Sequence, residues 1–196
     1  MALLSGKKIL VTGVLSNRSI AYGVAKAARR EGAELALTYQ NDRFKDRVTD
    51  MAGELGSDLA LPCDVTSDQE IQELFSRLRD KWQNLDGLVH AIAFAPREAI
   101  AGDFLDGISR AAFAQAHDIS SYSFAALAKG ALPLMQGRKA SLLTLTYLGA
   151  ARAVPCPFLR QARVAVEHRF DRELIQLGQR QLDEPGLDEH LHRRDI

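Results

Sequence analysis

The sequence has few of the features that mark secreted, metal-binding or membrane-spanning proteins. Its 196 residues include only two cysteines, Cys63 and Cys156, and their separation fits neither a disulfide framework nor a set of metal ligands. We therefore expect a reducing compartment, no metal site, and Cys63 in the core. The apolar stretch within residues 1–7 is too short for a signal peptide, and no later run reaches the length of a membrane span. These absences predict a soluble, cytoplasmic protein with no membrane partner.

Net charge is also lacking, since 25 lysines and arginines balance 25 aspartates and glutamates. No global field would draw the chain to nucleic acid or to an anionic membrane, which favours a small-molecule site. The length favours one domain with a sizeable core. We expect residues 1–155 to form this domain, and residues 156–196 to form an atypical segment of one helix and a polar tail rather than a second domain.

Short apolar runs alternate with helical patterns along the first part of the chain. This alternation predicts an α/β fold in which helices cover both faces of a parallel sheet. The five expected strands are Ile9–Thr12, Leu35–Tyr39, Leu59–Pro62, Leu88–Ile92 and Ser141–Thr146.

Three of the helices between these runs have specific signals. The first should span about Ile20–Arg30 and end at Gly32, which tolerates the left-handed conformation of a helix end. The third helix of the chain has one apolar stripe and a capping box formed by Ser67 and Glu70. A long alanine-rich helix over Ala111–Met135 should be buried on more than one side, and such helices often pack on a second subunit. The stripe consists of Ile71, Leu74, Phe75, Leu78 and Trp82, and the long helix carries Phe113, Phe124, Leu127 and Leu134.

The first strand leads through Gly13 to a helix start at Ser19 and Ile20, with Gly23 one turn further on. A strand, a glycine-containing loop and a helix N-terminus present free N–H groups and a positive dipole end to a phosphate. The spacing is not the usual G-x-G-x-x-G of dinucleotide sites, so an ordinary strand-to-helix turn remains an alternative.

Two further positions fit the adenosine half of a dinucleotide. Gln40 stands at the end of the second strand, where a carboxylate commonly binds the ribose hydroxyls or a cation binds a 2′-phosphate. A neutral amide favours NADH over NADPH, although Arg43 and Lys45 lie nearby. Asp64 and Val65 follow the third strand, where the carboxylate can accept from the adenine amino group and the next N–H can donate to the ring; alternatively, Asp64 is a solvated acid or a turn former.

The fourth strand ends in small residues, from His90 to Pro96, which allow backbone to approach a ligand. Ile92 is the expected cofactor contact in this segment. We expect His90 to be a core or hydrogen-bonded histidine rather than a catalyst.

Taken together, these segments closely resemble the bacterial NADH-dependent enoyl-acyl-carrier-protein reductases, which are divergent short-chain dehydrogenases. The resemblance covers about residues 4–155. The segments that carry it are Leu4–Lys7, Val11–Val14, Ser19–Gly23, Arg30–Ala36, Thr38–Asp42, Cys63–Val65, Phe94–Pro96, His117–Phe124 and Leu142–Ala150.

The resemblance implies a Rossmann-like, doubly wound parallel sheet in three α/β/α layers. It implies that NADH delivers hydride to the β-carbon of a trans-2-enoyl thioester on acyl carrier protein, a step of fatty-acid biosynthesis. In the family a tyrosine hydroxyl stabilises the developing enolate and a lysine holds the nicotinamide ribose. Tyr147 matches the first active-site tyrosine, and Ala95 is the expected substrate contact. A homo-oligomer, a tetramer in the family, is also implied.

The chain departs from the family pattern after Pro155. Pro157 and Val164 stand where the family's Tyr-x6-Lys pair belongs, and Arg163 is the nearest cation. No tyrosine follows Tyr147 and no lysine follows Lys139, so no small shift of alignment restores the pair. Alanines replace the family's usual serine at position 91 and glycine at position 93.

The family's later strands and its substrate-covering loop are missing too, so we expect a sheet that is incomplete at its C-terminal side. Val166, Phe170, Leu174 and Leu177 allow one amphipathic helix, and residues 183–196 form a polar end that we expect to be frayed or disordered.

Several alternatives therefore stay open. The altered segment could result from a reading-frame change or from divergence of a paralogue. The protein could be a reductase of altered competence, or a non-catalytic nucleotide-binding module able at most to bind cofactor or to join oligomers. A short-chain dehydrogenase acting on a carbonyl or alcohol would need the same missing tyrosine and lysine.

Overall fold

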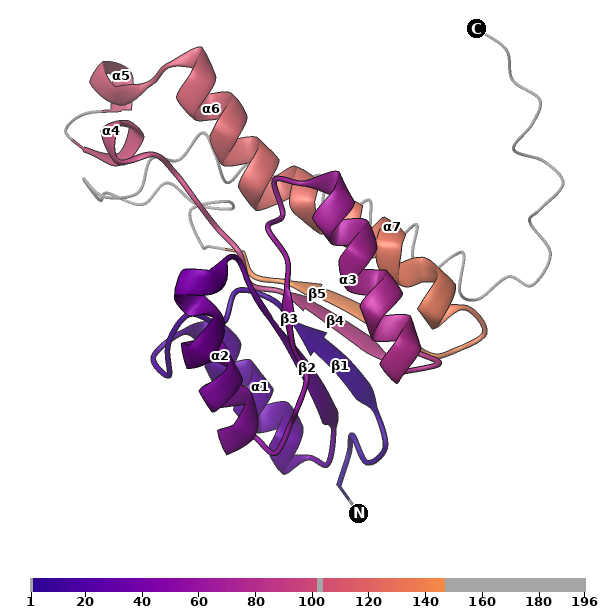
Figure 1. Ribbon diagram of the computed structural model, residues 1–196. Helices are drawn as coiled ribbons and strands as arrows, with labels where there is room; N and C mark the ends of the chain where they lie inside the picture. Colours follow the sequence, from indigo (N-terminus) through magenta and orange to yellow (C-terminus); the bar gives the residue numbers. More distant parts are fainter. Residues whose placement is uncertain (1, 102–103, 147–196) are drawn as a thin grey trace, which may run out of the picture.

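The computed structural model describes residues 2–101 and 104–146. Its strands form a single parallel sheet. The strand order is β3-β2-β1-β4-β5 (Figure 1). This confirms the expected five strands and parallel sheet, although β4 ends at His90 rather than Ile92 and β5 ends at Thr144 rather than Thr146. The strands are β1 Lys8–Val11, β2 Glu34–Tyr39, β3 Ala60–Pro62, β4 Gly87–His90 and β5 Ser141–Thr144.

Helices cover both faces of the sheet. Helices α1 and α2 lie on one face, and α3 and α7 lie on the other (Figure 1). The three-layer, doubly wound architecture is thus confirmed, whereas the helix and tail expected after residue 155 lie outside the described residues. The helices are α1 Ile20–Arg30, α2 Asp42–Glu54, α3 Asp68–Lys81, α4 Arg97–Ile100, α5 Phe104–Gly107, α6 Arg110–His117, the π-helix η1 Asp118–Tyr122, and α7 Ser123–Met135.

The ends of α1 and α3 follow from local sequence. The Ser19 hydroxyl accepts from the Tyr22 N–H at 3.2 Å at the start of α1, and Gly32 takes a φ of +89° just after its end. Ser67 likewise caps α3, accepting from the Glu70 N–H at 3.2 Å. The reciprocal half of the expected capping box is wrong, because the Glu70 carboxylate accepts instead from the Asp64 N–H at 2.7 Å.

The long helix expected over Ala111–Met135 is one helical path made of α6, η1 and α7 (Figure 1). As expected, Phe124, Leu127 and Leu134 are buried. Phe113 is not: it is 42% exposed and stacks on the His117 ring at a centroid distance of 4.2 Å. Helix α7 covers the sheet, whereas α6 extends beyond its edge, so Phe113 has no sheet to pack against (Figure 1).

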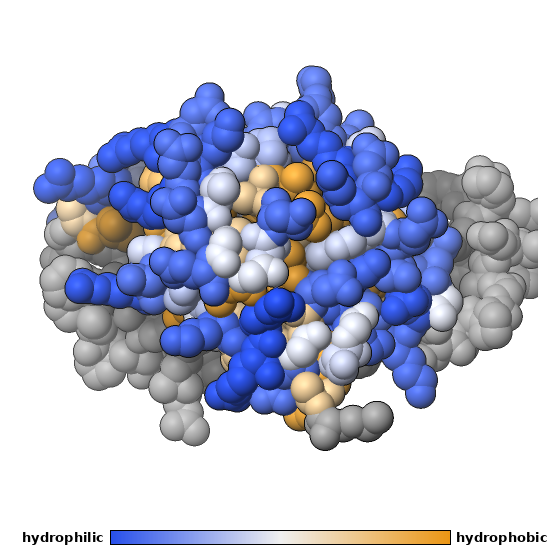
Figure 2. All heavy atoms as spheres, turned by 60° about the horizontal axis from the view of Figure 1, so that its bottom comes forward, coloured by the Kyte–Doolittle hydropathy of each residue, from blue (hydrophilic) through white to orange (hydrophobic). Residues whose placement is uncertain are grey.

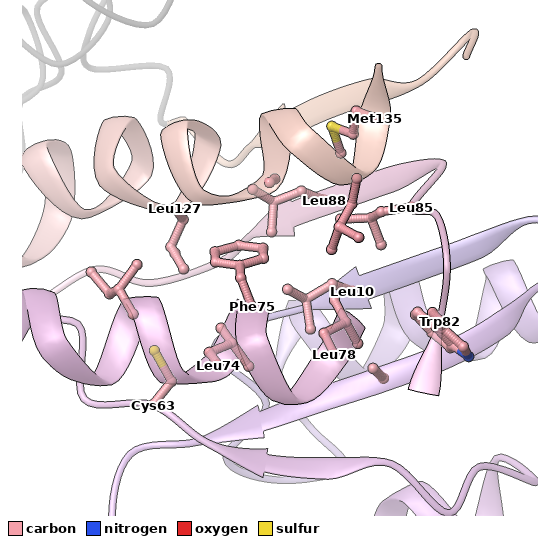
Figure 3. Close-up of a cluster of buried hydrophobic side chains, with 14 of the residues drawn as sticks. Leu10, Cys63, Leu74, Phe75, Leu78, Trp82, Leu85, Leu88, Leu127 and Met135 are labelled. Carbon is pink, nitrogen blue, oxygen red and sulfur yellow. The ribbon is translucent and has the colours of Figure 1, made fainter. Parts of the chain in front are cut away.

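The core between the sheet and helices α3 and α7 contains the predicted stripe of α3, including Phe75 and Trp82 (Figure 3). Cys63 belongs to this cluster, as expected from the sequence. Burial, with smaller contributions from Glu70 and Asp64, raises the pKa of its thiol to about 12. Cys63 therefore stays protonated at neutral pH and behaves as an unreactive apolar residue.

Helices α3 and α7 are in close contact at Gly130. A Cβ at this position would overlap the Phe75 ring, which lies between the two helices (Figure 3). Gly130→Ala should therefore lower the free energy of unfolding by about 1–3 kcal/mol, as overpacking of a core does. Gly53→Ala is the matched control, since Gly53 lies inside α2 with nothing within 4 Å of its Cβ position. Urea denaturation should show the control unchanged or stabilised by up to about 1 kcal/mol; equal effects of both changes would contradict this packing.

The lower side of the molecule in Figure 1 is mostly hydrophilic, with apolar atoms in the middle of the face and at its left and bottom edges (Figure 2). Within residues 2–101 and 104–146, none of the helices is both long and apolar enough to cross a membrane.

Candidate nucleotide-binding site

The crevice of the sheet lies at the carboxyl ends of β1 and β4. The chain leaves β1 toward α1 on one face and leaves β4 toward the α4–α7 region on the other, so the two loops diverge. Ligands of open α/β sheets bind at this switch point. The backbone N–H and the Oγ1 of Thr12 both donate to the Val89 carbonyl, at 2.9 and 3.0 Å, and hold the two strand ends together.

Gly13 lies directly against the loop after β4. Its φ is +81°, and a Cβ here would lie 2.6 Å from the carbonyl carbon of Ala91 and overlap the carbonyl oxygen. Only glycine fits this position without moving the loop after β4. The backbone of the loop after β1 therefore packs directly against the backbone of the loop after β4, beside the crevice.

Ser19 and Ile20 lie at the beginning of α1, as predicted. The Ser19 hydroxyl donates to the Ser16 carbonyl at 2.7 Å and accepts from the Tyr22 N–H, which fixes the loop against the helix. Ile20 is the first residue of α1, so its N–H belongs to the helix-terminal groups without an intrahelical partner. The geometry suits an anion at this end, which is the predicted role of both residues.

Gln40 and Asp64 meet although they are 24 residues apart in sequence. The Gln40 Nε2 donates to Asp64 Oδ2 at 3.1 Å, so the two predicted adenosine contacts form one unit at the ends of β2 and β3. The N–H and hydroxyl of Thr66 donate to Asp64 Oδ1 at 3.0 and 2.8 Å, which also makes Asp64 a turn former. Burial raises the pKa of Asp64, but the hydrogen bonds from Thr66 and Gln40 outweigh it and lower the pKa below its usual value. The carboxylate is therefore ionised at neutral pH.

Val65 is buried, so its contribution to a ligand would come from its backbone N–H. Ile92 and Ala95 follow β4 and are half-buried. Ser120 fastens this segment: its Oγ accepts from the Phe94 N–H at 3.0 Å and donates to the Phe94 carbonyl at 3.1 Å. Tyr147, the predicted active-site tyrosine, lies outside the described residues.

His90 is buried and hydrogen-bonded, as the sequence indicated. Its Nε2 lies 2.8 Å from Ser123 Oγ and its Nδ1 lies 3.2 Å from Thr144 Oγ1. Burial lowers the pKa of His90 to about 4. The ring is therefore neutral over the physiological pH range and does not act as an acid or base there.

The buried neutral His90 should make stability depend on pH. The folded pKa of about 4 lies below the ordinary 6.5, so the contribution of His90 is complete above pH 6.5 and is lost as the pH falls toward 4. The loss should reach about 3 kcal/mol, since one pKa unit corresponds to about 1.4 kcal/mol. Urea denaturation of the native protein and of His90→Gln at several pH values should show their difference in stability shrinking over this interval. A difference that is constant with pH would contradict the assignment.

Sequence reasoning missed Ser120 and Ser123, which fix the segment after β4 and the His90 ring. Ser120 lies in the π-helix η1 and Ser123 directly follows it, and single-turn π-helices are frequent at functional sites. Apolar periodicity predicts a helix in this stretch but does not distinguish a π-helix from an α-helix. The only sequence signal was the stretch His117–Phe124, which is part of the family resemblance.

A groove of about 560 Å³ lies elsewhere, between the loop after β1 and helix α2. None of the predicted cofactor residues lines it, so it is distinct from the candidate site. Its lining consists of Ser16, Asn17, Arg47, Asp50, Met51 and Glu54.

Comparison with known proteins decides the family. Residues 13–168 match the family model described as Enoyl-(Acyl carrier protein) reductase. The chain belongs to this family. Over 155 residues it is 59% identical to the NADH-dependent enoyl-[acyl-carrier-protein] reductase of Neisseria meningitidis and 54% identical to that of Escherichia coli, matches that cover 79% of this chain and 59% of each relative. The chain thus spans about three fifths of the length of these curated relatives.

Solved structures of the family superpose on the same fold. The reductase of Aquifex aeolicus aligns with a TM-score of 0.86 and 42% identity, covering 91% of this chain and 71% of its own. A reductase of Anaplasma phagocytophilum, solved in complex with NAD, aligns with a TM-score of 0.83 and 36% identity, covering 91% of this chain and 66% of its own. These alignments confirm the Rossmann-like fold and the family resemblance.

Proposed function

We propose that this chain binds NADH in the crevice between the ends of β1 and β4, and that its reaction class is enoyl-thioester reduction in fatty-acid biosynthesis. The observation that carries the proposal is the bare backbone at Gly13, packed on Ala91, on the same sheet edge as the Gln40–Asp64 pair. The names of the relatives, and the NAD-bound relative from Anaplasma phagocytophilum, support the cofactor.

The residues of the crevice suit a dinucleotide from one end to the other. Gly13 lets backbone approach the ligand, and the N-terminus of α1 at Ser19 and Ile20 suits the pyrophosphate. The Gln40 amide oxygen and the ionised Asp64 supply acceptors for ribose hydroxyls and the adenine amino group. The Val65 N–H would donate to the adenine ring, and Ile92 would border the nicotinamide half.

The Gln40–Asp64 pair should discriminate against NADPH. One of the two Gln40 amide N–H groups is engaged by Asp64, and the pair presents the Asp64 carboxylate and a neutral amide to the ribose. A 2′-phosphate would meet a like charge, which costs enough for NADPH to bind at least about tenfold more weakly than NADH. Calorimetric titration should show this ratio, and Asp64→Asn should reduce it. Asp58 is an exposed acid before β3, and Asp58→Asn should leave the NADPH-to-NADH affinity ratio unchanged. A ratio near one for the native protein would contradict the assignment, because Arg43 or Lys45 would then be binding the 2′-phosphate.

Bound NADH supplies the hydride for the β-carbon of a trans-2-enoyl thioester carried on acyl carrier protein. The chain must orient the thioester beside Ala95 and supply a hydrogen-bond donor to the oxygen on which negative charge develops. Tyr147 is the proposed supporting donor. Pro157 and Val164 cannot fill the roles of the family's second tyrosine and lysine, since neither side chain carries a donor.

This departure favours a second candidate function, a nucleotide-binding module with little or no turnover that joins oligomers of an intact relative. The two functions separate in one experiment, NADH oxidation with a short enoyl thioester beside an NADH titration of the same preparation. We expect saturable binding, and turnover at least about 10²–10³-fold below that of an intact reductase, the usual cost of losing one such donor. Turnover equal to the intact enzyme would overturn the residue assignment, and absence of binding would overturn the proposal itself.

A further inference from the structure

His90 is the one fully buried histidine of the described chain, and it joins three elements around the crevice. It ends β4, its Nδ1 faces Thr144 at the end of β5, and its Nε2 faces Ser123 at the start of α7. Its carbonyl accepts from the Leu145 N–H at 3.2 Å, just beyond β5. The ring also lies against Phe124, at a centroid distance of 5.4 Å.

The hydrogen bonds define the tautomer of the ring. Ser123 Oγ donates its single proton to the Ile119 carbonyl at 2.7 Å, so it can only accept from His90. Nε2 therefore carries the proton, and Nδ1 of the neutral ring accepts from the Thr144 hydroxyl. Hydrogen bonds thus run in one direction from β5 to the π-helix η1, through Thr144, His90, Ser123 and Ile119.

This series of hydrogen bonds connects two segments of the candidate site. His90 immediately precedes Ala91, whose carbonyl contacts Gly13. The π-helix η1 holds the segment after β4 through Ser120 and Phe94. Gln40 and Asp64, by contrast, lie at the ends of β2 and β3, on the other side of β1. Because a dinucleotide spans the crevice with its adenosine half near β2, its nicotinamide half lies on the His90 side.

We propose that His90, held as the Nε2–H tautomer between Thr144 and Ser123, is a positioning residue that fixes the nicotinamide half of the cofactor site. The inference rests on the proposed function. His90 touches no cofactor itself. It sets the spacing of β4, β5 and η1, and thereby the position of the Ala91 and Ile92 backbone. Losing either hydrogen bond should loosen the nicotinamide half while leaving the adenosine half intact.

The test compares the affinities for NADH and for ADP-ribose, which lacks the nicotinamide. Thr144→Val removes the donor to Nδ1 at constant shape, and His90→Ala removes the ring. For both variants the Kd of NADH should rise about tenfold or more, the equivalent of about one lost hydrogen bond, and the Kd of ADP-ribose should change less than about twofold. His90→Gln keeps a donor toward Ser123 and should restore part of the NADH affinity.

A variant destabilised elsewhere provides the control for a merely structural role. Gly130→Ala lowers stability between α3 and α7 and should leave both Kd values unchanged. Nitrogen-15 spectra of the histidines should show His90 protonated at Nε2 and unprotonated at Nδ1. Equal changes for both ligands, no change for either, or an Nδ1–H tautomer would overturn the inference. Failure of the native protein to bind NADH would instead overturn the proposed function.

Discussion

Gly13→Ala should greatly weaken NADH binding. The left-handed φ of +81° costs an alanine about 1–2 kcal/mol, and the overlap with the Ala91 carbonyl should add about 1–3 kcal/mol. The loop after β4 must move to relieve that overlap, and this displaces backbone on both sides of the crevice. We expect a rise in the Kd of NADH of roughly 100-fold or more, corresponding to about 2.7 kcal/mol, measured by calorimetry.

Gly137→Ala separates backbone strain from the loss of the site. Gly137 also has a positive φ, +71°, but nothing lies within 4 Å of its Cβ position, after the end of α7. It should lose about 1–2 kcal/mol of stability and keep its NADH affinity. If Gly13→Ala bound NADH as tightly as this control, the crevice between β1 and β4 would not be the binding site.

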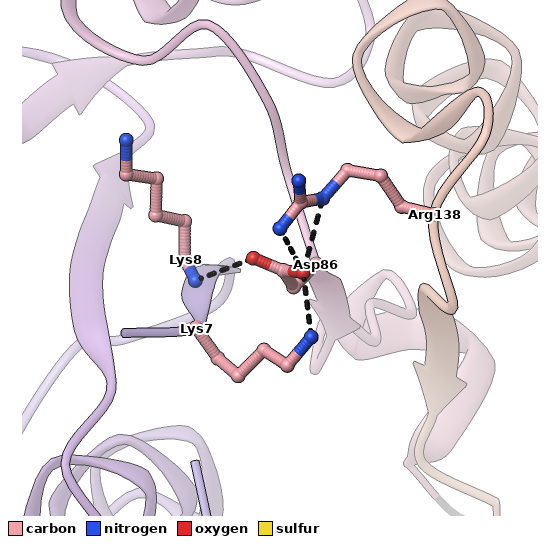
Figure 4. A network of polar contacts seen from close by, with 4 residues as sticks. All are labelled: Lys7, Lys8, Asp86 and Arg138. Carbon is pink, nitrogen blue, oxygen red and sulfur yellow. Dashed lines mark hydrogen bonds and ion pairs between the residues drawn. The ribbon is translucent and has the colours of Figure 1, made fainter. Parts of the chain in front are cut away.

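Asp86→Ala should cause the largest loss of stability without touching the candidate site. The Asp86 side chain is 3% exposed and accepts from Lys7 Nζ at 3.0 Å, from the Lys8 N–H at 3.0 Å, and from Arg138 Nη2 at 2.7 Å (Figure 4). These bonds join the starts of β1 and β4 to the loop after α7. Removing one partner of a buried pair costs about 3–5 kcal/mol. Because the Lys7 and Arg138 side chains are 39% and 33% exposed and can rehydrate, we expect about 2–3 kcal/mol in urea denaturation.

Two comparisons check the role of Asp86. Asp58→Ala, at an exposed acid, should change stability by less than about 0.5 kcal/mol. Burial raises the pKa of Asp86, but its bonds to Lys8, Arg138 and Lys7 outweigh burial and lower the pKa below the ordinary 3.8. Its contribution is therefore complete above pH 3.8 and is lost as the pH falls below it. A gap between the native protein and Asp86→Ala that widens toward acid pH would contradict this assignment.

Local sequence patterns were sufficient for most of the fold. The expected span of α1, about Ile20–Arg30, agrees with the structure, where Ser19 caps its start and Gly32 follows its end, and the stripe of α3 predicted its buried face. Phe113 was misplaced because periodicity shows which face of a helix is apolar without showing how far the sheet beneath it extends. The Glu70 carboxylate was misassigned because the competing Asp64 N–H comes from the preceding loop.

The candidate site was predictable where one residue carries the function, and less so where two distant residues share it. Gly13, Gln40 and Asp64 could each be proposed from their places at strand ends, and the structure brings Gln40 and Asp64 into contact. The partners of His90 could not be proposed in this way, since they lie 33 and 54 residues further along the chain. Only the packing of β5 and α7 on β4 brings them together.

A crystal structure of the protein grown with NADH would show directly whether the crevice binds the dinucleotide. We expect density across the carboxyl edge of the sheet, with adenosine beside Gln40 and Asp64, pyrophosphate at the start of α1, and nicotinamide toward Ala91 and Ile92. Density in the groove between α2 and the loop after β1, or a crevice empty at saturating NADH, would contradict it.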